Sequence, residues 1–454
     1  MPVEVPKALV EEVKAGNCVA FVGAGFSAAA GMPGWKHLLS RMADVGRPGR
    51  SASLRMIDDL LAQPTASSRQ LEMAAQILQD ELGLERYHRR LRDTLGRPEA
   101  IPPRMRHRLD RLTGIPFRAI VTTNFDPLLS GITPSGAAWR QLLRPAAHRW
   151  WDQRFWPSVD DGRAPGPLVV KLHGDLSAEG ARDLVLTRRE FRSRLHGDPS
   201  YLTALRSLFA TTTILFLGYS LSDAYLDQVR GELLEALSTD EKVPITAWAL
   251  LPDPSPLERT YYARHEGIEL VPYRKDSDPP HADFDAFLDQ LYEQTNPIHI
   301  LARRLRGRRI LWMDPNEDWN ENGMRFLTAA VARASAAEGL EPTDLFVSVD
   351  TVEEAARALD GEPGFDLIIT RWGHGLQRRP DGTPCADAEV LLDRVAERRA
   401  RGRAMPPVIV FATGAYADEN KPASLRAGAL AYTSTWETLF QAMDAALAPG
   451  SATL

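Results

Sequence analysis

The sequence predicts an α/β protein with two parallel sheets, and three observations lead to this class. Short apolar runs recur along the 454 residues without polar alternation, which is typical of strands buried on both faces. Helical patterns separate these runs, as expected for strand-helix-strand units. The rhythm breaks at 298–307 and then resumes, so we expect two domains, 1–297 and 308–454, joined by a linker.

The first domain should be a Rossmann-like parallel sheet with a helical insertion. Residues 36–116 contain amphipathic helical patterns but no clear strand, so we place the insertion there. Five arginines lie between Arg303 and Arg309, in the linker and directly after it, and for them a solvated connector helix is favoured over a phosphate-binding patch. The predicted strands are 18–23, 117–124, 168–174, 212–219, 245–251 and 268–273.

The second domain should have a flavodoxin-like (βα)5 fold, because five strand-helix units follow one another in about 140 residues. Its predicted strands are 308–314, 344–349, 366–370, 407–413 and 429–433.

Composition excludes several classes of protein. Hydrophobic residues make up 44% and charged residues 25% of the chain, and the net charge is −6, so no global field favours nucleic acid or membranes. The two cysteines, Cys18 and Cys385, support neither a disulfide framework nor a zinc site. Without a signal peptide or a membrane-length apolar run, we expect a cytoplasmic protein. Aromatic and basic residues alternate at 148–156, where a packed loop is favoured over a nucleic-acid platform.

A glycine-rich turn follows the first strand. The segment FVGAGFSAAAGMPGW places Gly23, Ala24 and Gly25 between this strand and a predicted helix, with Ser27 close behind. Glycine lets a ligand approach the main chain, and helix N-termini bind anions, so the turn could hold phosphates. A tight structural turn is the alternative. The dinucleotide spacing G-x-G-x-x-G is not met, because Ala28 takes the third position, which disfavours an ordinary dehydrogenase.

Polar residues follow three further strands. Asn124 and Asp126 follow one strand, and His173 and Asp175 follow another. Since ligands bind beyond the carboxyl ends of parallel strands, we expect these groups to meet in one crevice, although each could simply form a turn. The third set is Gly218, Tyr219, Ser220 and Asp223.

These motifs together resemble the sirtuin family over roughly residues 10–295. GAGFSAAAGMPGW is similar to the segment that holds NAD, TTNFD resembles Thr-Gln-Asn-Ile-Asp, KLHGD resembles the histidine segment, and GYSLSD stands where Gly-Thr-Ser meets the adenosine ribose. The KLHG and GYS motifs are most similar to those of sirtuin-like domains in bacterial antiviral defence proteins. Sirtuin deacylases carry a four-cysteine zinc module, which this chain lacks, so the resemblance implies NAD+ hydrolysis without zinc.

The resemblance also implies roles for individual residues. His173 would be the general base, Asn124 would position the nicotinamide ribose or the water, and Asp126 would bond the carboxamide. The expected NAD+ contacts are phosphates at Gly23, Ala24, Gly25 and Ser27, the nicotinamide side at Pro33 and Trp35, and the adenosine ribose at Gly218 and Ser220. Tyr219 between them is also expected to contact NAD+. The chain would then be an NAD+ glycohydrolase effector of an anti-phage, abortive-infection system, releasing nicotinamide and ADP-ribose.

The second domain resembles response-regulator receiver domains with a degraded site. Asp314 remains after the first strand, but Pro315 replaces the second acid and Arg371 replaces the phosphoacceptor. Thr413 matches the switch hydroxyl, and Thr435 or a neighbour replaces the expected lysine. We therefore expect a pseudo-receiver, or a TIR-like domain of the same topology, that regulates or docks.

The fusion of a sirtuin-like domain to a receiver-like domain suggests that the second domain controls the activity of the first. Activity would be gated by homo-oligomerisation or by a partner defence protein, such as a HerA-like ATPase, with no membrane and no direct nucleic-acid contact. One alternative is a protein deacylase or ADP-ribosyltransferase. The other is a catalytically silent sensor of NAD or ADP-ribose.

Overall fold

A computed structural model describes most of the chain as two compact units, the first ending at Thr295 and the second beginning at Asn296. The described residues are 3–44, 51–63, 66–96, 100–143, 167–176, 184–221, 224–237, 244–315, 317–336, 344–373, 377–378, 382, 384–412 and 419–448. Asp223, Thr413 and the segment 148–156 lie outside them. No helix among these residues is long and apolar enough to cross a membrane.

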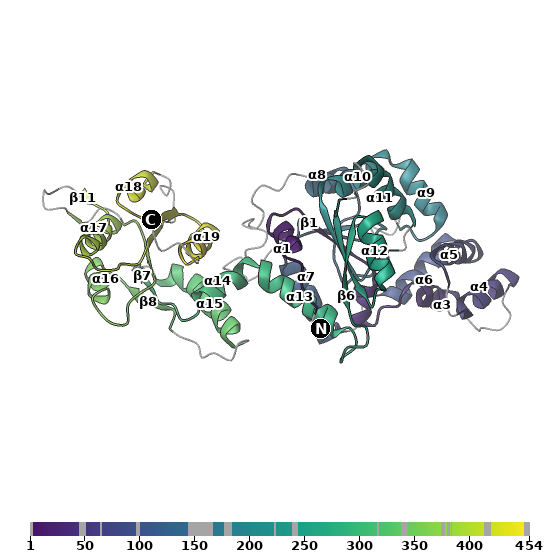
Figure 1. Ribbon diagram of the computed structural model, residues 1–454, viewed down its shortest axis with the longest axis horizontal. Helices are drawn as coiled ribbons and strands as arrows, with labels where there is room; N and C mark the ends of the chain where they lie inside the picture. Colours follow the sequence, from purple (N-terminus) through teal and green to yellow (C-terminus); the bar gives the residue numbers. More distant parts are fainter. Residues whose placement is uncertain are drawn as a thin grey trace. The chain divides into compact units, whose positions relative to one another are not determined.

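The first unit is built on a six-stranded parallel sheet in the order β3-β2-β1-β4-β5-β6 (Figure 1). The chain therefore winds from β1 to one edge and returns to β4 on the other side of β1, which is the Rossmann order. The strands are β1 (Cys18–Val22), β2 (Ala119–Thr122), β3 (Leu168–Lys171), β4 (Thr213–Leu217), β5 (Ala247–Pro252) and β6 (Ile268–Tyr273).

Both faces of this sheet are covered by helices, which explains why the strands lack polar alternation. Cys18, Ala20 and Val22 of β1 enter a core with α1, α7 and α13. Val19 and Phe21 enter the opposite core with α8, α10 and α11. These helices are α1 (Lys7–Lys14), α7 (Pro103–Gly114), α13 (Ala282–Thr295), α8 (Gly136–Leu143), α10 (Pro199–Thr211) and α11 (Ala224–Leu237).

The helical insertion has a core of its own. Leu39, Leu78 and Leu91 from three of its helices pack in one cluster, which also takes in Phe125 and Leu186 from beyond the carboxyl ends of β2 and β3. The helices of the insertion lie side by side in Figure 1. The insertion therefore packs against the carboxyl end of the sheet. It comprises α3 (Trp35–Ala43), α4 (Ala52–Ala62), α5 (Ser68–Leu82) and α6 (Leu84–Leu95); the remaining elements of this unit are α2 (Ala24–Ser27), the 3-10 turn η1 (Ala28–Ala30), α9 (Arg188–Gly197) and α12 (Pro256–His265).

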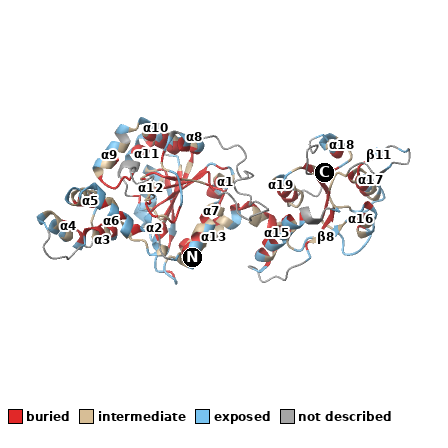
Figure 2. Cartoon of the chain, turned by 180° about the vertical axis from the view of Figure 1, so that it is seen from behind, coloured by how far each residue is buried: buried red, intermediate tan, exposed pale blue. Residues whose placement is uncertain are grey.

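The second unit has a five-stranded parallel sheet in the order β13-β12-β9-β7-β8, which is the flavodoxin-like order 2-1-3-4-5 read from the other edge. Its two faces are again buried by helices (Figure 2). The two sheets confirm the predicted fold class. The elements are α14 (Pro297–Leu305), β7 (Ile310–Met313), α15 (Glu317–Ala336), β8 (Phe346–Val349), α16 (Val352–Ala358), β9 (Leu367–Thr370), β10 (Gln377–Arg378), β11 (Pro384–Cys385), α17 (Asp387–Ala400), β12 (Val408–Phe411), α18 (Lys421–Arg426), β13 (Ala431–Thr433) and α19 (Trp436–Ala446).

Helix α14 occupies the residues for which the sequence suggests a linker. Leu301 and Leu305 are fully buried in a core of the second unit. Arg304 pairs with the buried Asp444 of α19 at 2.5 Å, and Arg308 pairs with Asp366. The arginine run is thus largely tied into the second unit.

Asp314 and Arg371 follow neighbouring strands of the second sheet, β7 and β9. Asn320 donates its amide N–H to Asp314 Oδ2 at 2.9 Å, and Arg371 pairs with Asp387 Oδ2 at 3.0 Å. The position that resembles a phosphoacceptor therefore carries a guanidinium already engaged by a carboxylate.

Candidate active site

A cavity of about 820 Å³ opens beyond the carboxyl ends of the strands in the first unit. It lies where the strand order reverses, between β1 and β4, which is where open α/β sheets bind ligands. Of the residues predicted to bind NAD+ or to act in catalysis, all except Gly23 line it, whereas Asp175, also expected in this crevice, does not. The lining includes Ala24, Gly25, Ser27, Pro33, Trp35, Asn124, Asp126, His173, Gly218, Tyr219 and Ser220.

Asn124, Ser27 and Asp126 form one hydrogen-bonded group. Asn124 donates its two amide hydrogens to Gly23 O and to Ser27 Oγ, each at 3.1 Å. Ser27 in turn donates to Asp126 Oδ2 at 2.9 Å. Because both Nδ2 hydrogens are used, the amide oxygen of Asn124 is the atom that can accept a bond from a ligand or a water.

The backbone before Asn124 is fixed by Thr122 at the end of β2. Thr122 Oγ1 donates to Val22 O at 2.8 Å and accepts from Asn124 N at 3.0 Å. This hydroxyl joins β1 to the turn after β2, so the position of Asn124 is set by the sheet.

Asp126 is buried, with a 6% exposed side chain. Its second oxygen, Oδ1, accepts from Leu128 N at 3.2 Å. Burial raises the pKa of Asp126, while the Ser27 hydroxyl, the Leu128 amide and the Lys171 ammonium act in the opposite direction. An ionised carboxylate has about four acceptor positions, so Asp126 can still accept one more donor from the cavity.

His173 lies half-buried in the turn after β3. Its ring sits 6.2 Å from that of Phe125 and 5.4 Å, nearly perpendicular, from that of Phe191. The backbone N–H of Val185 donates to His173 O at 2.9 Å, which ties the turn to the segment before α9. The imidazole is therefore held between two aromatic side chains at the wall of the cavity.

The segment after His173 is also anchored at the start of α9. Thr187 and Glu190 form a capping box, in which Glu190 Oε2 accepts from Thr187 N and Leu186 N, each at 2.9 Å. Leu186, Thr187 and Phe191 line the cavity beside His173.

The glycines of the first turn are required by the protein's own packing. A Cβ on Gly23 would lie 2.6 Å from Gly218 O, and one on Gly25 would lie 2.9 Å from the same atom. The amide of Gly25 donates to Gly218 O at 2.8 Å. Gly218 has φ +61° and would place a Cβ 2.2 Å from Phe26 N. Close contact between the turns after β1 and β4 therefore accounts for these glycines, beside any approach by a ligand.

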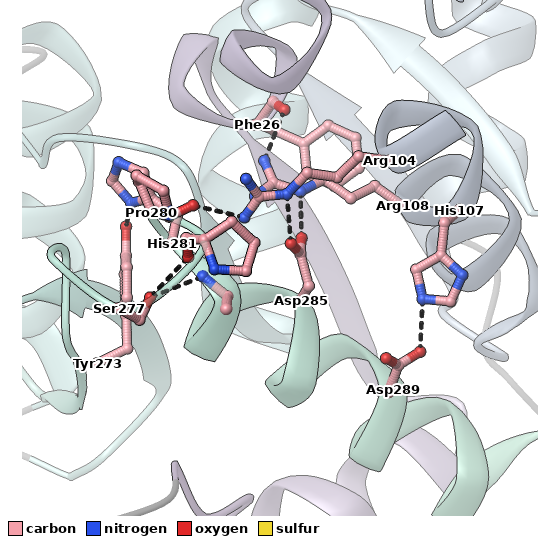
Figure 3. A network of polar contacts seen from close by, with 12 residues as sticks. Phe26, Arg104, His107, Arg108, Tyr273, Ser277, Pro280, His281, Asp285 and Asp289 are labelled. Carbon is pink, nitrogen blue, oxygen red and sulfur yellow. Dashed lines mark hydrogen bonds and ion pairs between the residues drawn. The ribbon is translucent and has the colours of Figure 1, made fainter. Parts of the chain in front are cut away.

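Charged residues that the sequence analysis did not single out line the β5–β6 side of the cavity (Figure 3). Arg104 and Arg108 of α7 both pair with Asp285 of α13, the former at 2.6 Å. Arg108 also donates to Phe26 O at 3.2 Å, so it reaches the helix after the glycine turn. The sequence contains one pattern that could have indicated these residues. Two arginines four residues apart in PRMRHRL and two aspartates four residues apart in ADFDAFLD each lie on one face of a helix.

A tyrosine-histidine pair completes this side. Tyr273 Oη lies 3.0 Å from His281 Nδ1 (Figure 3). Burial raises the pKa of Tyr273 to about 12. Burial, followed by Arg108, Arg104 and Lys275, lowers the pKa of His281. Both groups are thus neutral hydrogen-bonding side chains near pH 7.

Part of the first unit is similar to a known protein family. Residues 118–271 match the family model described as SIR2-like domain. This range runs from β2 to β6 and includes Asn124, Asp126 and His173.

The chain is also similar to curated proteins named NAD(+) hydrolase ThsA. It is 28% identical to the protein of Acinetobacter baumannii over 226 residues, which covers 50% of this chain and 41% of the relative. It is 25% identical to the protein of Enterococcus faecium over 244 residues (52% and 44%) and to that of Cytobacillus dafuensis over 235 residues (52% and 40%). The chain spans less than half the length of these relatives.

Proposed function

We propose that the first unit is an NAD+ glycohydrolase that cleaves NAD+ to nicotinamide and ADP-ribose. The observation that carries this proposal is the meeting of Asn124, Asp126 and His173 at one cavity on the switch point of the sheet. The similarity to proteins named NAD(+) hydrolase supports the choice of substrate.

In this mechanism the dinucleotide lies across the β1–β4 switch point, with nicotinamide toward β2 and β3. Asp126 accepts a bond from the carboxamide N–H₂, and Asn124 Oδ1 accepts from the attacking water. The C–N electron pair leaves with nicotinamide, which departs neutral, and positive charge develops on the ribose. Water bonds to the anomeric carbon as His173 takes its proton, the task of a general base.

The surroundings favour this chemistry in two ways. Phe125 and Phe191 beside His173 restrict water to the reacting position. The bonds from Asn124 to Gly23 and Ser27 hold its amide oxygen in place before the substrate arrives, so little reorganisation is needed in the transition state.

Replacement of either proposed catalytic residue tests this function. We expect Asn124→Ala and His173→Ala each to reduce NAD+ loss by at least about 100-fold, the range typical of positioned acid-base groups. Purified protein is incubated with NAD+ and the products are identified by mass spectrometry. His265→Ala, an exposed histidine of α12 outside the cavity, is the matched control and should turn over like the wild type.

Unchanged turnover in either cavity variant, with circular dichroism showing an intact fold, would refute the site. Tight NAD+ binding without any products would contradict hydrolysis and favour a sensor. Faster nicotinamide release on adding an acetylated peptide would favour a deacylase.

We further propose that this activity serves anti-phage defence in the cytoplasm and is gated through the second unit. Unrestrained loss of NAD+ would harm the host, so the enzyme should act only after assembly into an oligomer or contact with a partner protein. The engaged guanidinium of Arg371 supports docking or ligand sensing over phosphorylation for the second unit.

A further inference from the structure

Lys171, the last residue of β3, is a charged side chain with no solvent exposure. Its ammonium donates to Asp126 O at 2.7 Å and to Phe125 O at 3.3 Å. It also pairs with Asp175 Oδ2 at 3.1 Å. An ammonium has three hydrogens, so these three acceptors use its full donor capacity.

These bonds join the two turns that carry the proposed catalytic residues. Phe125 and Asp126 belong to the turn after β2, directly behind Asn124. Lys171 and Asp175 bracket the turn that presents His173, where Gly174 N also donates to Lys171 O at 3.2 Å. One buried cation therefore fixes the separation between the Asn124 turn and the His173 turn.

The sheet alone does not fix that separation. Parallel pairing between β2 and β3 ends with Thr122 opposite Lys171. Beyond that pair, Leu172 N still donates to Thr122 O at 2.8 Å. Farther out, the Lys171 ammonium bonds the Asn124 turn to the His173 turn.

Stability is a poor reason to bury this cation. Removing an ammonium from water is costly, and well-packed apolar residues commonly replace a buried ion pair without loss of stability. The bonds to two carbonyl oxygens instead set positions of the main chain, which an apolar side chain of the same size cannot do.

We infer that Lys171 is a positioning residue that holds Asn124 and Asp126 at their working distance from His173. The kinetic test of this inference rests on the proposed function. The link that Lys171 makes between the two turns can also be measured without turnover. The ammonium lies behind both turns and acts through their backbones.

The test compares Lys171→Met with the double variant Lys171→Met/Asp175→Asn in the full chain. The single variant leaves the Asp175 carboxylate without its ammonium, so both its thermal midpoint and kcat should fall. The double variant removes both charges, and its thermal midpoint should return toward the wild-type value. If Lys171 positions the turns, kcat of the double variant stays about 10- to 100-fold low, as expected for a misplacement of about 1 Å.

KM for NAD+ should change by less than about threefold in both variants, because the glycine turn and the β5–β6 side of the cavity are untouched. Lys7→Met, on an exposed position of α1, is the matched control and should retain wild-type kcat and stability. Recovery of wild-type kcat in the double variant would overturn the inference, because Lys171 would then only balance the charge of Asp175.

A second readout separates this inference from the proposed function. Protein labelled with ¹³C at histidine Cε1 gives a His173 signal that is assigned by its loss in His173→Gln. Lys171→Met and the double variant should both shift or broaden that signal, whereas Lys7→Met should not. An unmoved His173 signal would overturn the tie, while absent NAD+ cleavage by the wild type with every candidate activator present would overturn the proposed function alone.

Discussion

The Ser27 hydroxyl links the two polar side chains of the turn after β2, those of Asn124 and Asp126, by hydrogen bonds. It accepts from Asn124 and donates to Asp126, so a single hydroxyl fixes the amide orientation and stabilises the carboxylate. The sequence analysis assigned Ser27 to phosphate binding, and the structure gives this hydroxyl two protein partners. Any contact of Ser27 with a phosphate would have to compete with these bonds.

Asp126 should make stability depend on pH in a recognisable direction. Because burial raises its pKa, the folded state holds the proton more tightly than the unfolded state. The contribution of Asp126 to the free energy of unfolding is therefore greatest below the unfolded pKa of about 3.9 and decreases as pH rises through the folded pKa. The slope from one group is at most about 1.4 kcal/mol per pH unit.

Urea denaturation from pH 4 to 7 measures this contribution as the difference between wild type and Asp126→Asn. Relative to the variant, the wild type should lose stability as pH rises. Asp110→Asn, an exposed carboxylate of α7, should give a curve parallel to the wild type. A wild type that gains stability over Asp126→Asn with rising pH would contradict the expected sign.

Residues at strand ends were accessible from the sequence because a run of apolar residues followed by Asn, His or Gly locates the ligand edge of a parallel sheet. Arg108 and Lys171 were not accessible in this way. Arg108 meets Asp285 across 177 positions, and Lys171 meets Asp126 across 45. The spacing of four residues places the arginines of α7 and the aspartates of α13 each on one helix face, but which elements pack against each other is not encoded locally.

At the scale of elements, the turn after β1 and the turn after β4 fit together through glycines. The sequence analysis weighed a ligand against a tight structural turn for these glycines, and the contact between Gly25 and Gly218 supports the second reason. The strand assignments succeeded because helices cover both faces of each sheet, so most strand positions are apolar.

Gly218→Ala should destabilise the first unit by about 3 kcal/mol or more. Its φ of +61° is unfavourable for alanine, and the new Cβ would lie 2.2 Å from Phe26 N and 2.7 Å from Gly25 C. Gly231→Ala in the exposed face of α11 is the matched control, because its Cβ meets nothing within 4 Å.

The control change should raise stability by about 0.5–1 kcal/mol, the usual gain for alanine over glycine in a helix. Chemical denaturation of both variants gives the two values. A Gly218→Ala variant as stable as the wild type would mean that the two turns can separate without cost.

At the scale of the whole chain, each unit has its own apolar cores, so each should fold alone when the chain is divided after Thr295. The place of the cut matters because α14 belongs to the second unit. Leu301 and Leu305 are fully buried there, and burying each stabilises the unit by about 1.5–3 kcal/mol.

Fragment 296–454 should therefore show a cooperative unfolding transition, whereas fragment 308–454 should be about 3–6 kcal/mol less stable. Urea titrations of the two fragments provide the comparison. Equal midpoints would show that α14 contributes little.

Fragment 1–295 tests gating by the second unit. We expect its rate of NAD+ cleavage or its oligomeric state to differ from that of the full chain, measured by product formation and by light scattering. If rate, assembly and partner binding all match those of the full chain, regulation by the second unit is excluded.

Successive side chains of β1 point to opposite faces of the sheet, and this alternation limits insertions and deletions in the strand. Even-numbered and odd-numbered residues of β1 enter opposite cores. Deletion of one residue within the strand would exchange the two sets, so that Phe21 would occupy the position of Ala20 in the opposite core. The glycine turn would also shift by one residue relative to Gly218. Insertions and deletions should therefore be far more damaging in these five residues than the conservative apolar substitutions that the same strand can absorb.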